Sequence, residues 1–232
     1  RDMTRASATP RREFLKSSGG AAASALVLGA GSAVHAAEDN TIRLALIGCG
    51  GRGTGAAADA MSVKNGPIKL VAMADVFQSR LAGSYENLKK QFAAQVDVPE
   101  DRKFLGFDAY RKAIDCLRPG DVAILTTPCA FRWVHFGYAV EKGVNVFMEK
   151  PVAVDAPATR KMLALAEASE KKNLRVGVGL MCRHCKARWE LLDRIRAGQI
   201  GEITMLRTYR LIGPAGFTGP KPEGMSELLY QV

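Results

Sequence analysis

A glycine-rich turn between an apolar run and a helical segment constrains the fold more than any other feature. The run Ile42–Ile47 leads directly into Gly48-Cys-Gly-Gly-Arg-Gly53, and a helical pattern follows from Thr54. In this G-x-G-x-x-G pattern the first glycine permits a tight turn, the second lets the backbone approach a diphosphate, and the third allows close helix packing. The helix start adds unpaired N–H groups and a positive dipole end. The pattern therefore predicts a dinucleotide site that includes Gly48, Gly50, Gly51, Arg52 and Gly53.

An acidic residue follows at the expected place. Asp75 ends the next apolar run, 22 residues beyond Gly53, where a ribose hydroxyl would be bound. A carboxylate here favours NAD, because it would repel the 2′-phosphate of NADP, but nearby Arg80 leaves NADP open. The alternative interpretation is a glycine-rich loop with a helix-capping Asp.

Short β-branched runs alternate with longer helical stretches from residue 41 onward, which is typical of a parallel sheet flanked by helices. We predict strands over Ile42–Ile47, Ile68–Ala74, Val122–Thr126, Val144–Met148 and Arg175–Val178. We predict helices over Thr54–Met61, Gln78–Gln91, Tyr110–Cys116, Phe131–Lys142 and Pro157–Lys172. The predicted fold class is α/β, with a doubly wound parallel-sheet Rossmann domain at residues 41–180.

The pattern changes after Gly179. We predict a helix over Lys186–Ala197, a strand over Ile203–Leu211 and a loop rich in glycine and proline over 213–224. Because a lone strand is not stable, this strand needs a partner. We therefore interpret residues 181–232 as the incomplete beginning of a truncated α+β substrate and oligomerisation domain, and we expect the full-length protein to form a homo-oligomer.

The N-terminal segment resembles an export signal. Pro10-Arg-Arg-Glu-Phe-Leu-Lys16 precedes a mild apolar run over 19–34 and a small-residue cleavage site after Ala36. The pattern predicts a twin-arginine signal peptide at residues 1–36, a periplasmic or otherwise exported protein, and no stable membrane span after cleavage. An amphipathic helix is the alternative.

The charge and the cysteines do not indicate a further function. The formal net charge is +10, but basic and acidic residues are interspersed and aromatic residues make up only 7%, so we expect no nucleic-acid partner. Cys182-Arg-His-Cys185 has the spacing of half a zinc site, but one pair cannot complete a tetrahedral set, and we predict no metal.

A second group of polar residues lies at the ends of later predicted strands. Thr126-Thr127-Pro128 ends one strand, His135 lies on the following helix, and Glu149-Lys150-Pro151 ends the next strand. Open α/β sheets bind ligands at this edge, so these groups can converge on the nicotinamide half of a cofactor. The alternative for Glu149-Lys150-Pro151 is a surface turn.

Together these motifs resemble the Gfo/Idh/MocA family, named after glucose-fructose oxidoreductase and inositol dehydrogenase. The resemblance covers about residues 41–210 and includes Thr127-Pro128 with His135, Gly143–Pro151, and Gly198-Gln-Ile-Gly-Glu-Ile203. It implies that Glu149 and Lys150 lie at the nicotinamide and substrate, with Lys150 as the catalytic residue. It also implies a cis peptide before Pro151, and it places the loop of Arg183 beside the substrate; the alternative for Arg183 is a solvated arginine.

The resemblance implies an NAD(P)-dependent oxidoreductase acting on a sugar, polyol or related carbohydrate. Two alternatives are a non-catalytic nucleotide-binding protein and a redox-neutral enzyme that keeps its NAD through each cycle. The family pattern adds an Asp and a His in the second domain, but none of the three histidines follows residue 184. We expect those groups in a missing C-terminal half, and otherwise expect no activity.

Overall fold

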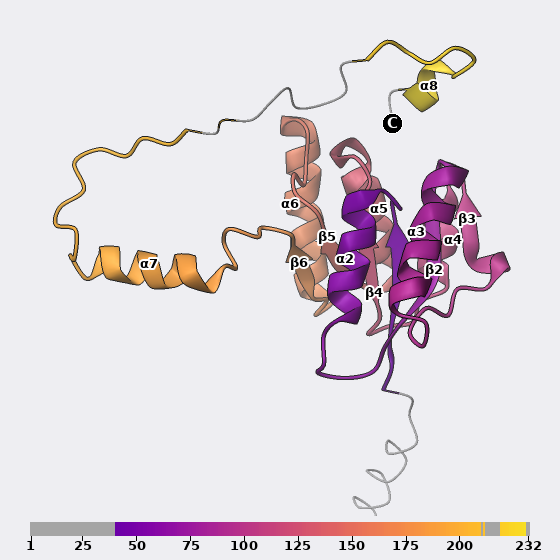
Figure 1. Cartoon of the computed structure of the whole chain (residues 1–232), viewed down its shortest axis with the longest axis horizontal. Helices are drawn as coiled ribbons and strands as arrows, with labels where there is room; N and C mark the ends of the chain where they lie inside the picture. The colour runs from indigo at the N-terminus through magenta and orange to yellow at the C-terminus, as the bar shows by residue number, and fades with distance from the viewer. Residues whose placement is uncertain (1–39, 210, 212–218, 231–232) are drawn as a thin grey trace, which may run out of the picture. The chain divides into compact units, whose positions relative to one another are not determined.

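A six-stranded parallel sheet covered by helices forms the compact unit that begins at Ile42 (Figure 1). The computed structural model describes residues 40–209, 211 and 219–230, so the predicted signal at 1–36 lies outside the described residues. The strand order is β3-β2-β1-β4-β5-β6, and all neighbouring strands are parallel. The strands are β1 (Ile42–Ile47), β2 (Ile68–Asp75), β3 (Lys103–Leu105), β4 (Val122–Leu125), β5 (Asn145–Met148) and β6 (Val176–Val178).

The helices cover the sheet in two groups, which pack into two separate apolar clusters. One cluster contains α2 and α3, and the other contains α4, α5 and α6. The chain therefore crosses from one face to the other between β3 and β4, next to the central pair β1 and β4. The helices are α2 (Gly51–Met61), α3 (Gln78–Gln91), α4 (Ala109–Asp115), α5 (Arg132–Lys142), α6 (Ala156–Lys171), α7 (Lys186–Arg196) and α8 (Glu227–Tyr230), with short 3-10 turns at Glu100–Arg102 and Cys129–Phe131.

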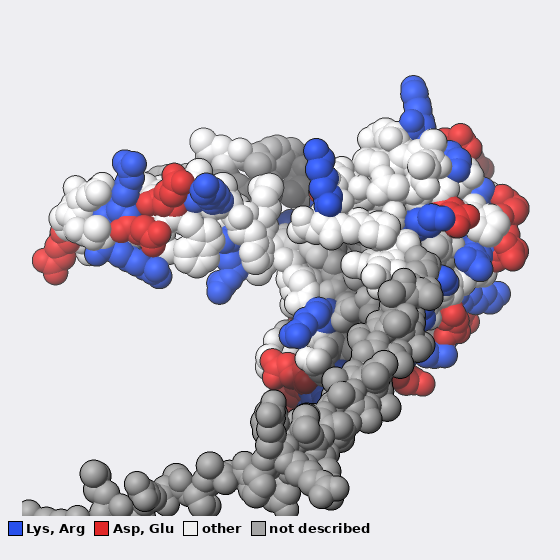
Figure 2. Space-filling view, turned by 90° about the horizontal axis from the view of Figure 1, so that it is seen from below, with Lys and Arg blue, Asp and Glu red and all other residues white. Residues whose placement is uncertain are grey.

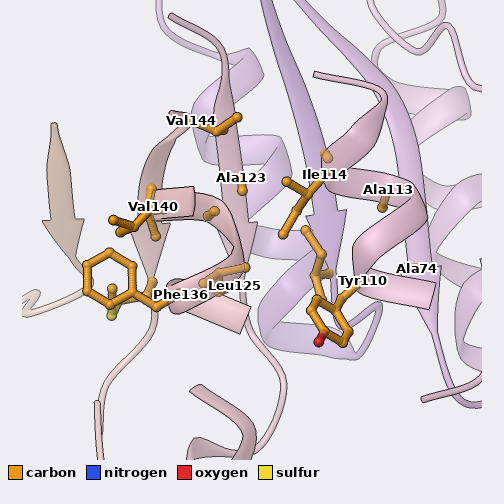
Figure 3. Close-up of a cluster of buried hydrophobic side chains, with 14 of the residues drawn as sticks. Ala74, Tyr110, Ala113, Ile114, Ala123, Leu125, Phe136, Val140 and Val144 are labelled. Atoms are coloured by element: carbon orange, nitrogen blue, oxygen red, sulfur yellow. The ribbon is translucent and has the colours of Figure 1, made fainter. Parts of the chain in front are cut away.

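The central strands are apolar on both sides because both faces of the sheet are covered. Residues 44–47 of β1 and 123–125 of β4 are each at most 3% exposed. Neighbouring residues of β4 divide between the clusters: Ile124 packs with α2 and α3, whereas Leu125 packs with α4 and α5. Figure 3 shows the second cluster, in which side chains of α4 and α5 gather with Ala123 and Leu125.

Local signals fix the ends of two helices near the strands that carry polar residues. α5 ends at Lys142, and Gly143 after it has a φ of +72°, a left-handed conformation that favours glycine. At the start of α6, the Asp155 carboxylate accepts a hydrogen bond from the Ala158 N–H at 2.7 Å, and Pro157 lies in the first turn. Gly143 thus ends the helix before β5, and Asp155 caps the helix after β5.

The predicted parallel sheet and the ten helices and strands predicted over residues 42–172 and 175–178 are confirmed, with end shifts of up to three residues. The largest shift is at α2, which begins at Gly51 rather than Thr54. The short edge strand β3 was not predicted, since three residues beginning with a lysine give no period-two pattern.

The prediction of a strand at Ile203–Leu211 is wrong for the described residues 203–209, which form no regular structure. Their apolar side chains are exposed, including Leu206 at 86% and Tyr209 at 71%. A strand needs hydrogen bonds from a neighbour, and no described segment pairs with this one. The helix predicted before it is confirmed as α7.

Charged side chains of both signs are interspersed on the molecular face shown in Figure 2. Among the described residues, none of the helices is long and apolar enough to cross a bilayer.

Candidate functional site

The glycine turn after β1 has too little space for side chains at two of its positions. Gly48 has a φ of +96°, and a Cβ on it would lie 2.7 Å from the Thr127 nitrogen. A Cβ on Gly53 would collide with the Gly48 carbonyl oxygen and lie 2.6 Å from Thr126 Oγ1. At Gly50, by contrast, a Cβ would meet no atom within 4 Å. The turn is therefore packed tightly on its inner side and open at its tip.

The N-terminus of α2 lies at this open tip. The first hydrogen bond of the helix runs from the Thr54 N–H to the Gly50 carbonyl at 2.9 Å, and no side chain caps the helix. The first turn contains no acidic residue. The backbone amides that precede Thr54 therefore form an electropositive end that suits an anion.

Asp75 joins the glycine turn to the end of β2. Its buried carboxylate accepts hydrogen bonds from the Cys49 N–H at 2.6 Å and from the Phe77 N–H at 2.8 Å. Each oxygen accepts one backbone N–H and keeps further acceptor capacity. Asp75 can thus hold the turn in place and still accept a ligand hydroxyl.

Cys49 lies within the glycine turn, and its thiol is unreactive. Its side chain is 3% exposed, and burial together with the charge of Asp75 raises the pKa of the Cys49 thiol. The sulfur therefore stays a neutral thiol that packs beneath the turn.

A cleft beside the glycine turn brings most of the predicted residues together. Its walls come from the glycine turn, the end of β2, the start of α4 and the segment after β4. They include Gly48, Gly50, Asp75, Arg80, Phe107, Tyr110, Thr126, Thr127, Pro128, Phe131 and His135. The carboxyl ends of neighbouring parallel strands thus form one site at the sheet edge, as the sequence predicts.

Two threonines after β4 act differently within the cleft. The Thr126 hydroxyl donates to the Gly48 carbonyl at 2.6 Å, so it braces the glycine turn. The Thr127 hydroxyl lies 3.2 Å from Nδ1 of His135. His135 is 6% exposed, and its ring centroid lies 4.3 Å from that of Tyr110. Burial, aided by the positive charge of Arg132, lowers the pKa of His135 from 6.5 to about 4, so its imidazole is neutral at physiological pH.

Glu149 is buried at the end of β5, outside the lining of this cleft. Its Oε1 accepts a hydrogen bond from Arg52 Nε at 2.9 Å, and this bond raises the pKa of Arg52. Arg52 also lies 3.4 Å from Asp59 on α2. The Arg52–Glu149 ion pair thus links the glycine turn to the end of β5.

Lys150 and Arg183 are both exposed. The Lys150–Pro151 peptide bond is cis, as the family resemblance implies. Arg183 lies in the turn after β6 and lines a surface hollow with residues of α7, not the cleft beside the glycine turn. Lys150 lies next to Glu149 because the two residues are consecutive in the chain. Arg183 does not line the cleft that contains most of the other predicted residues.

Residues 42–179 match the Gfo/Idh/MocA oxidoreductase family in its NAD-binding Rossmann fold. The chain belongs to this family. No curated protein matches the sequence significantly.

Solved structures share the fold. A myo-inositol 2-dehydrogenase from Lactobacillus plantarum has 24% identity and a TM-score of 0.56, with 71% of this chain and 43% of that chain covered. A scyllo-inositol dehydrogenase from Lactobacillus casei with bound NAD(H) and scyllo-inositol has 23% identity and a TM-score of 0.53, with coverage of 71% and 44%. An oxidoreductase from Thermotoga maritima has 25% identity and a TM-score of 0.52, with coverage of 70% and 45%. The chain thus spans less than half the length of these structures.

Two residues of this Gfo/Idh/MocA chain shape the site without having been predicted from the sequence. A Cβ on Gly179, just after β6, would lie 2.6 Å from Glu149 Oε1, so the missing side chain makes room for the carboxylate. Arg132 is 2% exposed and hydrogen-bonds to the carbonyls of Leu125 at the end of β4, Thr127 after β4 and Glu149 after β5. A sequence signal for Arg132 exists, because it shares a helical face with Phe136, Ala139 and Val140.

The cysteine pair gains no further ligands. All five cysteines are free thiols, and nowhere in the described parts of the chain do three His, Cys, Asp or Glu side chains gather as a metal site would require.

We expect Gly53→Ala to lower the free energy of unfolding by about 3 kcal/mol, because the new methyl group meets backbone atoms that cannot move aside. Gly51→Ala is the matched control, since a Cβ there would meet no atom within 4 Å, and it should change stability by less than about 1 kcal/mol. Urea unfolding of both variants measures the difference. Equal stabilities would contradict the tight packing of the third glycine.

The lowered pKa of His135 predicts a pH-dependent stability. Between about pH 6.5 and 4 the unfolded chain binds a proton at His135 that the folded chain does not, so stability should fall as the pH falls. The slope from this group is at most about 1.4 kcal/mol per pH unit. His135→Gln should show a shallower decline in urea unfolding across this window, whereas His184→Gln, at an exposed position, should follow the parent protein. Identical slopes for all three proteins would refute the prediction.

Proposed function

We propose that this chain carries the cofactor domain of an NAD(P)-dependent oxidoreductase that transfers a hydride between nicotinamide and a sugar, polyol or related carbohydrate. The observation that carries the proposal is the contrast within the glycine turn. Gly53 is closed in by the Gly48 carbonyl, whereas Gly50 faces open space beside the uncapped start of α2. A diphosphate needs this combination of close approach and free amides.

Asp75 and the aromatic residues of the cleft fit the adenosine half of the cofactor. Asp75 keeps acceptor capacity for ribose hydroxyls, and the aromatic rings of Tyr110 and Phe131 line the same cleft. The carboxylate would face the 2′-phosphate of NADP, which supports NAD as the preferred cofactor. Arg80, the nearby cation, is exposed and lies over the Phe77 ring with its Cζ 4.6 Å from the centroid.

The catalytic role in this proposal belongs to Lys150. A bound nicotinamide supplies the hydride acceptor or donor. When an alcohol is oxidised to a ketone, its carbon loses a hydride and its hydroxyl loses a proton. A neutral Lys150 amine would take that proton, and the ammonium form would return it in the reverse reaction. Glu149, held by Arg52, would keep a fixed negative charge beside this residue.

A carbohydrate or polyol as substrate is supported by the family and by the inositol dehydrogenases among the structural neighbours. Arg183 would contact the substrate only if residues 181–209 approach the end of β5 in the complete protein.

Export and assembly are also part of the proposal. The Arg11-Arg12 pattern and the apolar run after it support twin-arginine export to the periplasm, which fractionation of producing cells would test. We further expect the full-length protein to be a homo-oligomer, which sedimentation would test.

The cofactor assignment predicts the effect of one substitution. Gly50→Ala should leave the melting temperature unchanged, because its Cβ would meet no protein atom within 4 Å, but weaken NADH binding by about tenfold or more by blocking the diphosphate. NADH and NADPH titrations followed by nicotinamide fluorescence measure both affinities, and NADH should bind more tightly. Gly66→Ala is the control, since Gly66 also has open space around it but lies in the loop before β2 at the opposite sheet edge. Unchanged NADH affinity in Gly50→Ala would contradict the proposed diphosphate site.

The catalytic assignment predicts a loss of turnover. In the full-length protein, Lys150→Met should lower kcat for NAD-dependent oxidation of a carbohydrate by about 10²–10⁴-fold, the range for removing a general base. NADH affinity should change little. Lys64→Met is the control, because exposed Lys64 lies between α2 and β2 at the opposite sheet edge. A kcat within threefold of the parent in Lys150→Met would remove Lys150 from the mechanism.

A further inference from the structure

Arg132 is the most deeply buried cation among the described residues, and it lies at the site without belonging to any predicted motif. Its side chain is 2% exposed, and burial lowers the pKa of Arg132. Taking a guanidinium out of water costs free energy that only well-placed acceptors offset. Its three acceptors are all backbone carbonyls, and they lie on two different segments of the sheet edge.

These hydrogen bonds show which backbone segments the Arg132 guanidinium connects. Nη1 donates to the carbonyls of Leu125 and Glu149, both at 2.7 Å, and Nη2 donates to the carbonyl of Thr127 at 2.7 Å. Leu125 also accepts from the Glu149 N–H at 3.0 Å, which is the last rung between β4 and β5. Beyond that rung the two segments continue as Thr126–Pro128 and Glu149–Pro151. Arg132 thus joins them where backbone pairing has ended.

The Glu149 carbonyl belongs to the peptide unit that carries the Lys150 N–H. Because a peptide unit is planar, holding this carbonyl fixes the direction in which the chain leaves toward the Lys150 Cα. The Lys150 side chain itself is exposed, so the backbone beneath it is the part that Arg132 can hold. The Thr127 carbonyl is held by the same guanidinium, which sets the distance between the cleft wall and the Glu149-Lys150 segment.

We propose that Arg132 is a positioning residue for hydride transfer: its planar guanidinium holds the Glu149-Lys150 peptide against the segment after β4, so that Lys150 meets substrate bound beside the cofactor. This role rests on the proposed function. A lysine could not replace it, because a single ammonium nitrogen cannot occupy both the position from which Nη1 donates to Leu125 and Glu149 and the position from which Nη2 donates to Thr127. Arg132 touches neither substrate nor cofactor in this account.

The test compares catalysis with stability in the full-length protein. Arg132→Lys and Arg132→Gln should lower kcat by about 10²-fold, the effect of an ångström-scale misplacement of a reacting group. The KM for NAD should rise by less than threefold, because the glycine turn and Asp75 are unchanged. Arg160→Lys and Arg160→Gln, at an exposed position on α6, are the matched controls and should keep the parent kcat. Rates are measured well below each melting temperature, so that all protein is folded.

Chemical rescue provides a readout that a purely stabilising role would not move. In Arg132→Ala, added methylguanidinium at millimolar concentration should raise kcat saturably, and it should leave Arg160→Ala unchanged. A kcat within threefold of the parent in folded Arg132→Lys and Arg132→Gln would overturn the proposal. Failure of all three Arg132 variants to fold would also overturn the proposal, because the hydrogen bonds of Arg132 would then be needed to fold the sheet and not to position Lys150. Absence of NADH binding or turnover in the parent protein would instead reject the proposed function.

Discussion

The site depends on how closely the start of α2 approaches the ends of β1 and β4. No side chain fits between Gly53 and the Gly48 carbonyl, and the Thr126 hydroxyl fills the remaining space with a 2.6 Å hydrogen bond to that carbonyl. The Asp75 carboxylate then holds the turn from the other side through the Cys49 N–H. Three neighbouring strands thus contribute one contact each. The result is a backbone surface whose amides point outward, which side chains alone could not form.

A second set of contacts organises the other half of the sheet edge around Glu149. Arg52 binds its carboxylate, Gly179 leaves space for that carboxylate, and Arg132 binds its backbone carbonyl. Because Arg52 belongs to the glycine turn, its ion pair with Glu149 connects the glycine turn directly to the end of β5. A displacement of the turn would therefore also move Glu149, the residue that precedes Lys150. This coupling exists because the Arg52 guanidinium binds the Glu149 carboxylate.

The sequence predicts those parts of the molecule in which local pattern and long-range packing agree. The glycine turn, Asp75 and the strands β1, β2 and β4 all carry strong local signals, because both their faces are buried and their ends must turn sharply. Gly179 carries little local signal, and for Arg132 the local pattern indicates only that it lies on the buried face of a helix. Gly179 is required by a carboxylate 30 residues away in the chain, and Arg132 binds carbonyls on two strands that only the folded sheet brings together. The strand predicted at Ile203–Leu211 fails for a related reason, since the sequence of one strand cannot supply the neighbouring strand that it needs.

The distribution of charge suggests why the two halves differ. In the cleft beside the glycine turn, His135 has its pKa lowered to about 4 and the Cys49 thiol has its pKa raised, so both are neutral and Asp75 is the buried anion there. At the end of β5 the side chains are charged: Arg52 pairs with Glu149, and the two terminal nitrogens of Arg132 donate to three backbone carbonyls. Neutral aromatic walls suit the binding of a flat base and a sugar, which need shape and few hydrogen bonds. Fixed charges suit a proton transfer, whose transition state is stabilised by groups that are already oriented. The same sheet edge can thus bind at one end and support chemistry at the other.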